Sequence, residues 1–209
     1  MQKLVELVNL WAKYEEENPG SEIRDFCVAY LTEQEAQAPA VRGTAGGLPS
    51  DLNARLGKGI GRLTRFSALY AKKALQDLPL NNIEELIYLA HIQYMGQPKK
   101  SELIYEMLSE FPSGIDIIKR LAAMALVDEF PDAHDKRSKR LRITPEGQTV
   151  LAQCMPRLAQ IGAMAFQPLR HLEKLMLAQL LEKLDDFHAA HYKSARNTDF
   201  EAVYRMVME

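Results

Sequence analysis

Residues 126–147, LVDEFPDAHDKRSKRLRITPEG, decide the fold of this chain. Residues 126–130 predict a short strand, and residues 131–135 are of the types that favour a turn. Between residues 138 and 144, Leu141 and Ile143 alternate with Arg140 and Arg142. This period of two is typical of a strand with one apolar face and one solvated, basic face. The stretch therefore predicts a β-hairpin with a positively charged tip.

The hairpin is flanked by helix signals. After it, Thr144 is a good N-cap, Pro145 suits the first helical position and Glu146 suits the first turn. Before it, the apolar spacing predicts a helix from a capping box at Asn81 and Glu84 to Met95. Two short helices follow at 99–109 and 112–125, with a tight turn at 110–111. This order is that of a winged helix-turn-helix domain.

The segment PDAHDKRSKRLRITPEG resembles the wing of the MarR family of winged helix-turn-helix transcriptional regulators. The matching residues are Asp132, Asp135, Lys136 and Arg137, together with the Thr-Pro-Glu-Gly that ends at Gly147. The resemblance implies a mainly α (α+β winged helix) fold, with a two-stranded wing and long dimerisation helices. It also implies a homodimer that binds double-stranded operator DNA, as a repressor responsive to a ligand or to stress.

Composition shifts along the chain predict its organisation. We expect an N-terminal helical extension at 1–36, a linker at 37–50, a dimerisation helix at 51–80, the winged helix-turn-helix domain at 81–144 and C-terminal dimerisation helices at 145–209. The long helices carry apolar faces wider than a monomer can cover, which favours a symmetric dimer. The extension, which the resemblance does not cover, is too small to fold alone. We therefore expect it to dock on the dimerisation helices of its own or the other subunit.

Other features limit the class of protein. The chain of 209 residues has a net charge of −2 and 47% hydrophobic residues, and no apolar run approaches the length of a membrane span. Cys27 and Cys154 lack metal-site spacing, which favours a reducing cytoplasm, and their apolar stripes predict buried, inert thiols. Glycines at 57, 59 and 61 follow no strand, so we expect close helix packing there rather than a phosphate site.

The resemblance, with the positive charge of the wing, implies which residues contact DNA. On the wing, the tip arginine is expected in the minor groove and the other cations on phosphates, while Asp132 and Asp135 support the wing. Asp135 is expected to orient Arg137 through a salt bridge. The predicted DNA-binding residues are Lys136, Arg137, Lys139 and Arg140 on the wing, Pro112, Ser113, Asp116, Lys119 and Arg120 on the recognition helix, and Lys99 and Lys100 before it.

The recognition helix departs from the family pattern. Gly114 and Asp116 stand where relatives commonly carry Thr or Val and a basic residue, and Ala125 replaces the usual Gly before the wing. An acid near DNA weakens binding unless it accepts from a cytosine amino group. A second function therefore stays open, in which the winged helix is a protein-interaction module with little DNA affinity.

Enzymes and metal proteins find less support in the sequence. It contains no catalytic constellation and calls for no cofactor. His188 and His191, with Asp185 one turn earlier, have ligand-like spacing, although solvated histidines explain them more simply. A cleft for a small-molecule effector can be lined by Tyr70, Tyr88, Tyr94 and Met95, although packing of these side chains in the core is the simpler interpretation.

Overall fold

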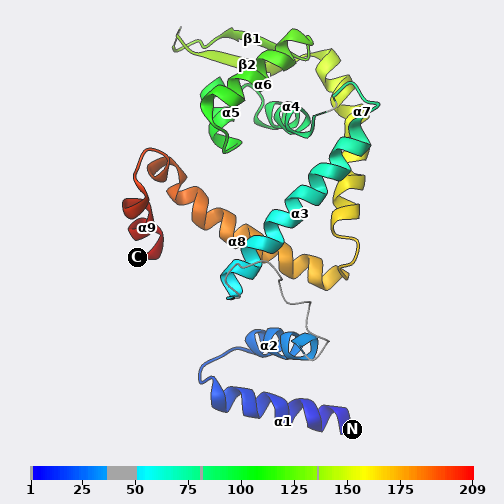
Figure 1. The fold of residues 1–209 in the computed structure, drawn as a ribbon, viewed down its shortest axis with the longest axis vertical. Coiled ribbons are helices and arrows are strands. Elements are labelled where there is room, and N and C mark those ends of the chain that lie inside the picture. The colour runs from blue at the N-terminus through cyan, green and yellow to red at the C-terminus, as the bar shows by residue number, and fades with distance from the viewer. Residues whose placement is uncertain (1, 37–50, 81, 136) are drawn as a thin grey trace. The chain divides into compact units, whose positions relative to one another are not determined.

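The computed structural model describes residues 2–36, 51–80, 82–135 and 137–209 (Figure 1). It divides into two compact units, Met1–Gly57 and Lys58–Glu209, and each is described by itself. In chain order the elements are α1 (Gln2–Glu17), α2 (Ile23–Ala36), α3 (Leu52–Leu75), α4 (Ile83–Met95), α5 (Lys100–Glu106), α6 (Phe111–Ala123), β1 (Val127–Pro131), β2 (Lys139–Ile143), α7 (Pro145–Ala165), α8 (His171–Ala195) and α9 (Phe200–Met208).

In the first unit, α1 and α2 form a helical hairpin closed by aromatic rings. Trp11 meets Phe26 edge-on with ring centroids 5.3 Å apart, and Tyr14 meets Phe26 at 5.6 Å. Phe26 is buried, while the neighbouring Cys27 is exposed. The prediction of a buried thiol at Cys27 is therefore wrong, because aromatic rings fill the hairpin instead. The predicted linker, 37–50, lies outside the described residues.

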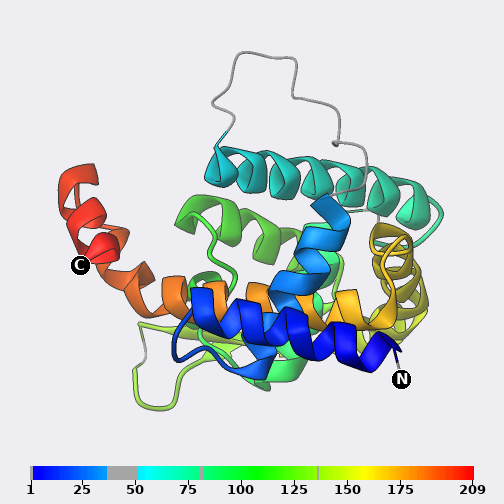
Figure 2. The same cartoon turned by 90° about the horizontal axis from the view of Figure 1, so that it is seen from below.

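The core of the second unit is the packing of α4 against α5, α6, β2 and α7 (Figure 2). The fully buried side chains are Leu75, Leu80, Leu86, Tyr88, Leu89, Ile92, Leu103, Ile104, Ile118, Leu121, Leu141 and Cys154. Burial raises the pKa of the Cys154 thiol, so the prediction of a buried, inert thiol is confirmed there. In the part of the chain that the structure describes, no helix is long and apolar enough to cross a membrane.

The helices of the helix-turn-helix differ slightly from the predicted bounds. The N-cap of α4 is Asn82, whose side chain accepts from the Glu84 amide at 2.9 Å, whereas the predicted cap, Asn81, lies outside the described residues. Helix α5 ends at Glu106, short of Ser109, because Leu108 adopts a left-handed φ of 50°. The amides of Leu108 and Ser109 then bond back to the carbonyls of Tyr105 and Ile104, the Schellman pattern.

Helix α6 starts at Phe111, one residue before Pro112, and closes in the same way at Ala125. The φ of Ala125 is 56°, and the Leu126 amide bonds to the carbonyl of Leu121 at 3.0 Å. The usual family glycine would adopt this backbone without strain, whereas an L-residue is disfavoured there by roughly 1–2 kcal/mol. Ala125 is therefore a strained helix end just before the wing.

We expect Ala125→Gly to stabilise the protein by about 0.5–1 kcal/mol, because it relieves this strain and Ala125 buries no side chain. For a chain of this size, the melting temperature rises by roughly 2–4 °C. Ala122→Gly, one turn earlier in the helical conformation, is the control and should lower the melting temperature. If both substitutions lower the melting temperature equally, the left-handed backbone at Ala125 does not destabilise the protein.

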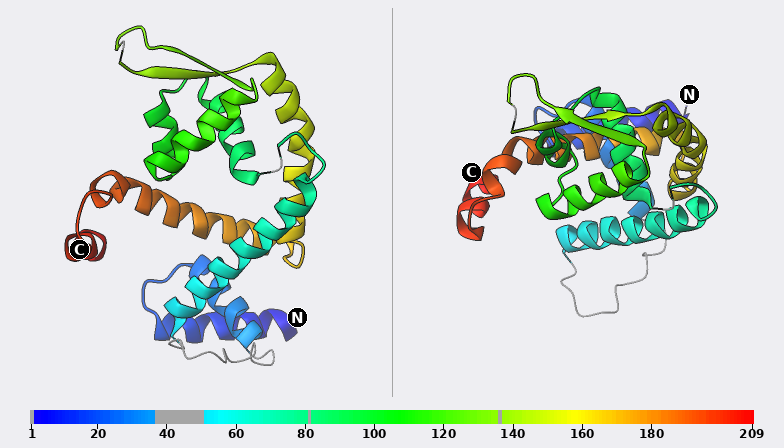
Figure 3. Two further views of the ribbon diagram at one scale, coloured as in Figure 1. Left: turned by 45° about the horizontal axis from the view of Figure 1, so that its top comes forward. Right: turned by 90° about the horizontal axis from the view of Figure 1, so that it is seen from above.

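The two strands form the predicted wing. They pair antiparallel, with Val127 opposite Ile143 and Pro131 opposite Lys139. Leu141 is fully buried, while Arg142 is exposed, as the period of two requires. Figure 3 shows the hairpin extending past α5 and α6. The prediction of a mainly helical winged-helix fold with a two-stranded wing is therefore confirmed.

The base of the wing is tied to α7. Thr144 caps α7 by accepting from the Gly147 amide at 2.9 Å, and its hydroxyl donates to the Ala125 carbonyl at 2.8 Å. The Thr144 amide donates to the Leu126 carbonyl at 3.0 Å. A Cβ on Gly147 would lie 2.2 Å from that same carbonyl oxygen. Only glycine therefore fits where α7 crosses the start of the wing.

Helices α3 and α8 bury little within one protomer. None of the described residues of α8 is buried, and its Leu172, Leu180 and Leu184 are about half exposed. A Cβ at Gly57, Gly59 or Gly61 of α3 would meet nothing within 4 Å. The close helix packing expected at these glycines is therefore not found within the protomer. The range predicted for the C-terminal helices, 145–209, contains α7, which accommodates the interior Pro156 and ends at Ala165, and α8, which begins at His171.

Candidate nucleic-acid interface

Helix α6 presents the predicted reading residues on one exposed side. Pro112, Ser113, Asp116 and Lys119 are exposed, while Gly114, Ile117, Ile118 and Leu121 of the same helix are buried. Lys119 pairs with Asp116 at 3.5 Å. The structure thus places these four side chains together, on the side of α6 that faces away from the core.

Two residues of α6, Arg120 and Gly114, fix its position against α4 and α5. Arg120 donates through Nε to Glu85 of α4 at 2.6 Å, and Glu85 is 7% exposed. A Cβ on Gly114 would lie 2.6 Å from Ile104 and 2.9 Å from the Tyr88 hydroxyl. Gly114 is therefore a packing position between α5 and α6, and the departure from the family pattern there does not lie on the reading side.

The wing is organised around Asp132. This residue is 2% exposed, and its Oδ1 accepts from the amides of His134 at 3.0 Å and Asp135 at 2.8 Å. Its Oδ2 accepts from Nε of Arg140, and Lys99 Nζ lies 3.8 Å from Oδ1. Arg140 also donates to the carbonyl of Gln97 at 2.6 Å. Lys99 and Arg140 therefore tie the wing to the start of α5.

The hydrogen bond from Arg140, with help from the two backbone amides and opposed by burial, lowers the pKa of Asp132 from 3.8 to about 2. A carboxyl with a depressed folded-state pKa stabilises the protein at pH values above its unfolded pKa. That contribution is lost as the pH falls from about 4 to about 2.

We therefore expect Asp132→Asn to lower the melting temperature at pH 7, with a difference from the unmodified protein that shrinks between pH 4 and pH 2. Asp128→Asn is the matched control, because Asp128 forms an exposed pair with Arg142 at 3.0 Å. It should change stability little at any pH. A difference for Asp132→Asn that stays constant down to pH 2 would show that the charge of Asp132 does not stabilise the wing.

Two further cations of the strands, Lys139 and Arg142, also have carboxylate partners. Glu129 lies between Lys100 Nζ at 2.5 Å and Lys139 Nζ at 3.4 Å. Burial acts to raise the pKa of Glu129, but the bonds and charges of the two lysines outweigh it and lower that pKa. Arg142 pairs with Asp128 and lies 5.5 Å from the centre of the Phe130 ring. Such pairs leave the hairpin close to neutral away from its tip.

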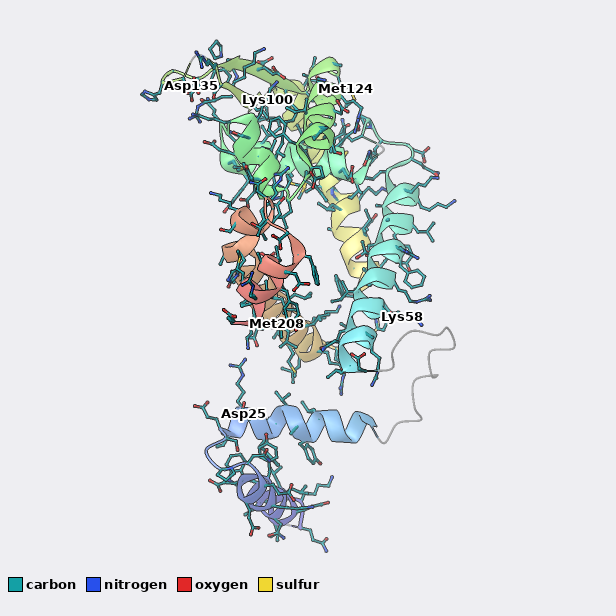
Figure 4. The ribbon with its side chains drawn as sticks, turned by 60° about the vertical axis from the view of Figure 1, so that its left-hand side comes forward. Asp25, Lys58, Lys100, Met124, Asp135 and Met208 are labelled. Atoms are coloured by element: carbon teal, nitrogen blue, oxygen red, sulfur yellow. The ribbon has the colours of Figure 1, made fainter. Side chains whose placement is uncertain are left out.

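At the tip of the wing, Asp135 does not form the salt bridge that the sequence predicts. Asp135 accepts from the amide of Arg137 at 3.0 Å and from the Ser138 hydroxyl at 2.7 Å. The Ser138 bond, followed by the Arg137 amide, lowers the pKa of Asp135. The predicted salt bridge to Arg137 is therefore wrong, because Asp135 shapes the turn instead (Figure 4). Among the described residues, Arg137 is a wing cation with no ion-pair partner. Lys136 lies outside them.

The residues predicted as metal ligands or as the lining of an effector cleft do not form a common site. No group of three or more metal-ligating side chains occurs among the described residues, and the His191 ring bonds to the carbonyl of Phe187 at 2.8 Å. Tyr88 is buried and its hydroxyl has no partner, whereas Tyr94 is 87% exposed. Glu85, Glu129 and Gly114 were not predicted as site residues. A sequence pattern alone cannot pair them with groups on other elements.

The chain matches the family model of a winged helix DNA-binding domain over residues 80–147. The HTH-type transcriptional repressor NicR of Pseudomonas putida is 27% identical over 122 residues, which cover 58% of this chain and 76% of that protein.

Solved structures share the fold. A mutant of MarR from E. coli, complexed with operator DNA, gives a TM-score of 0.59 at 21% identity, over 64% of this chain and 98% of that one. BpsR of Bordetella bronchiseptica, whose DNA binding is regulated by 6-hydroxynicotinic acid, gives 0.59 at 20% identity, over 63% and 98%. PcaV of Streptomyces coelicolor, in complex with its natural ligand, gives 0.58 at 19%, over 66% and 97%.

NicR is a transcriptional repressor and the matched family model is a DNA-binding domain, in agreement with the prediction that the chain is not an enzyme. The matched domain covers the helix-turn-helix and the wing, and the fold shared with MarR extends beyond it, over 64% of this chain. The resemblance seen in the wing is confirmed: residues 80–147 form a winged helix DNA-binding domain, and the chain shares the fold of MarR.

Proposed function

We propose that the chain is a homodimeric repressor of the cytoplasm that binds a specific operator and releases it in response to a small molecule or to stress. The observation that carries the proposal is the combination of an exposed side of α6 with Arg137 at the wing tip, which has no ion-pair partner in the described part of the chain. Ser113 and Asp116 lie where base edges are read when such a helix enters the major groove. Arg137 lies where a wing meets phosphates or the minor groove.

The paired cations have a different part in this proposal. Lys99 and Arg140 hold Asp132, and Lys100 and Lys139 share Glu129, so DNA contact by these four competes with carboxylates already present. We infer that they position the wing and contribute less to affinity than Arg137. The protein then gains affinity from few phosphate contacts and depends more on base contacts from α6.

A dimer is supported by the long helices. The apolar side chains of α3 and α8 lie exposed in the protomer, at Leu52, Leu56, Ile60 and Phe66 of α3 and Leu180 and Leu184 of α8. Such continuous apolar faces are uncommon on monomers and mark sites of association. The open glycines of α3 would let a second subunit approach closely. Two reading helices in a symmetric dimer match an operator with two half-sites.

An effector is supported by a cleft that is lined by residues of α5 and α8. The cleft has a volume of about 700 Å³ and lies between α5 and α8, with Tyr105 and Tyr192 among its lining residues. Arg196, at the end of α8, stacks on Tyr105 at 5.2 Å and pairs with Glu110 at 3.6 Å. Glu110 is the N-cap of α6. A molecule bound in the cleft would therefore act on the start of the reading helix.

The experiment compares one wing variant with one reading variant on a selected operator and on a scrambled duplex. Arg137→Ala should weaken binding to both duplexes by a similar factor and reduce the salt slope by about 1 per lost contact in each subunit. Asp116→Ala should change the preferred sequence, by roughly 1–3 kcal/mol per altered base contact, and raise non-specific affinity. Identical effects of the two variants on both duplexes would contradict this division of roles.

The alternative of an interaction module is not favoured, because the matched domain is a DNA-binding domain and the curated relative is a repressor. It would gain support only if the intact protein bound no duplex in a salt-dependent manner.

A further inference from the structure

The cleft between α5 and α8 has an acidic lining. In Figure 1 the C-terminal half of α8 passes below α5, and the cleft lies between the two helices. Its described lining includes three carboxylates, those of Glu102, Glu106 and Asp185, and one cation, Lys193. Among the described residues, none of the three carboxylates has an ion-pair partner. The cleft therefore attracts a positively charged molecule.

One of these carboxylates is already held in a fixed orientation. Glu102 accepts through Oε2 from the backbone amide of Lys99 at 2.7 Å, at the start of α5. Its Oε1 accepts no hydrogen bond from the part of the chain that the structure describes. A charged acceptor whose side chain is held in this way loses little conformational entropy when it binds a cation.

The guanidinium of Arg196 shows how a planar cation binds at one end of the cleft. It lies 5.2 Å from the centre of the Tyr105 ring and pairs with Glu110 at 3.6 Å. Tyr105 lines the cleft from α5, and a second ring, Tyr192, lines it from α8. The face of an aromatic ring attracts a cation through its negative charge density. Because Arg196 is balanced by Glu110, it does not offset the three carboxylates of the cleft.

The size and the apolar part of the cleft favour an organic molecule over a metal ion. No group of three or more metal-ligating side chains occurs in the described part of the chain, so the carboxylates do not converge on one point. The volume of about 700 Å³ is in the range of small-molecule sites. Met95, Leu108 and Ala189 give the lining an apolar part. A flat apolar body with a protonated group matches both parts of this lining.

We propose that the cleft between α5 and α8 binds an organic cation, a protonated amine or amidine on a flat apolar body, and that this is the effector class. The body lies against the tyrosine rings, and the positive group is held by Glu106 and Asp185. A cation on the Tyr105 ring competes with Arg196, which connects the cleft to Glu110, the N-cap of α6. The proposal rests on the proposed function for its effect on DNA, whereas the binding itself requires no DNA.

The test uses three molecules of nearly equal shape and different charge, namely benzamidine, benzamide and benzoate. Each is titrated into the full-length protein, and the shifts of backbone amide signals give its dissociation constant. Benzamidine should bind about tenfold more tightly than benzoate, the order that several exposed charge pairs supply together, with benzamide between them. The shifted signals should lie in residues 101–108 and 185–193. Benzoate binding as tightly as benzamidine, or benzamidine shifts confined to other residues, would overturn the proposal.

A cleft variant and a matched control locate the charge preference. Glu106→Gln/Asp185→Asn removes two carboxylates with little change in shape, so the affinities for benzamidine and benzoate should become nearly equal. Glu182→Gln/Asp186→Asn makes the same change in net charge at residues outside the described lining, and should keep most of the preference. An equal loss of preference in both variants would overturn the proposal, because the preference would then come from the net charge of the chain.

Operator binding separates this proposal from the proposed function. Benzamidine should weaken binding of a selected operator by the unmodified protein, and should have no such effect on Glu106→Gln/Asp185→Asn. If the protein binds the operator but prefers benzoate, the organic cation is wrong and the proposed function stands. If benzamidine binds in the cleft but no duplex is bound, the proposed function is wrong and the cation site stands.

Discussion

Gly147→Ala is expected to destabilise the protein by about 3 kcal/mol, the upper range for forcing an atom into a packed site. The added Cβ would lie 2.2 Å from the carbonyl oxygen of Leu126 and 2.8 Å from Ile143. That oxygen already accepts from the Thr144 amide, so it cannot move without breaking the bond that closes the wing. For a chain of this length the melting temperature should fall by roughly 6–12 °C.

Gly162→Ala is the control in the same helix, because a Cβ there would meet nothing within 4 Å. Alanine is favoured over glycine inside a helix by roughly 1 kcal/mol, so this variant should be more stable than the unmodified protein. Thermal unfolding followed by circular dichroism measures both. Equal melting temperatures for the two variants would mean that α7 does not need close contact with the start of the wing.

The second large effect concerns the proposed dimer. Leu180→Glu/Leu184→Glu places two carboxylates on an apolar face of α8 that is about half exposed in the protomer. Burying unpaired charges at an interface is strongly unfavourable, so this variant should have the mass of one chain by light scattering. Loss of the second half-site should reduce operator affinity by about 10²–10⁴, the gain that linked binding sites usually provide.

The matched control for this variant is Glu182→Gln, on the other side of α8. It should leave both the mass and the operator affinity unchanged. A dimeric mass for Leu180→Glu/Leu184→Glu would place the subunit contact elsewhere. A monomeric mass for the unmodified protein at micromolar concentration would remove the dimer from the proposal.

The local features of the fold could be read from the sequence because each rests on neighbouring residues. The alternation around Leu141 predicted β2, and Thr144 with Pro145 predicted the start of α7. The helix end at Glu106 could not be predicted, because a left-handed Leu108 leaves no sign in the sequence. Ala125 was visible only as a replacement for glycine, and the structure shows that its backbone keeps the left-handed form.

The candidate site was harder to predict, because its geometry depends on pairs between elements far apart in the sequence. Arg120 meets Glu85 across 35 positions, and Arg140 meets Gln97 across 43. The number of cations in the wing sequence therefore overestimates how many of them lack a carboxylate partner in the structure. Arg137 kept its predicted exposure because its turn is closed by local bonds, whereas Arg140 became part of the support of Asp132.

The central claim, that this winged helix binds an operator, is tested most directly by the salt dependence of binding. An operator is first selected from random duplexes with the unmodified dimer, and the dissociation constant is then measured over a range of salt concentrations. The logarithm of the affinity should fall linearly with the logarithm of salt, and the selected duplex should bind more tightly than a scrambled one throughout. No salt-dependent binding to any duplex would contradict the claim.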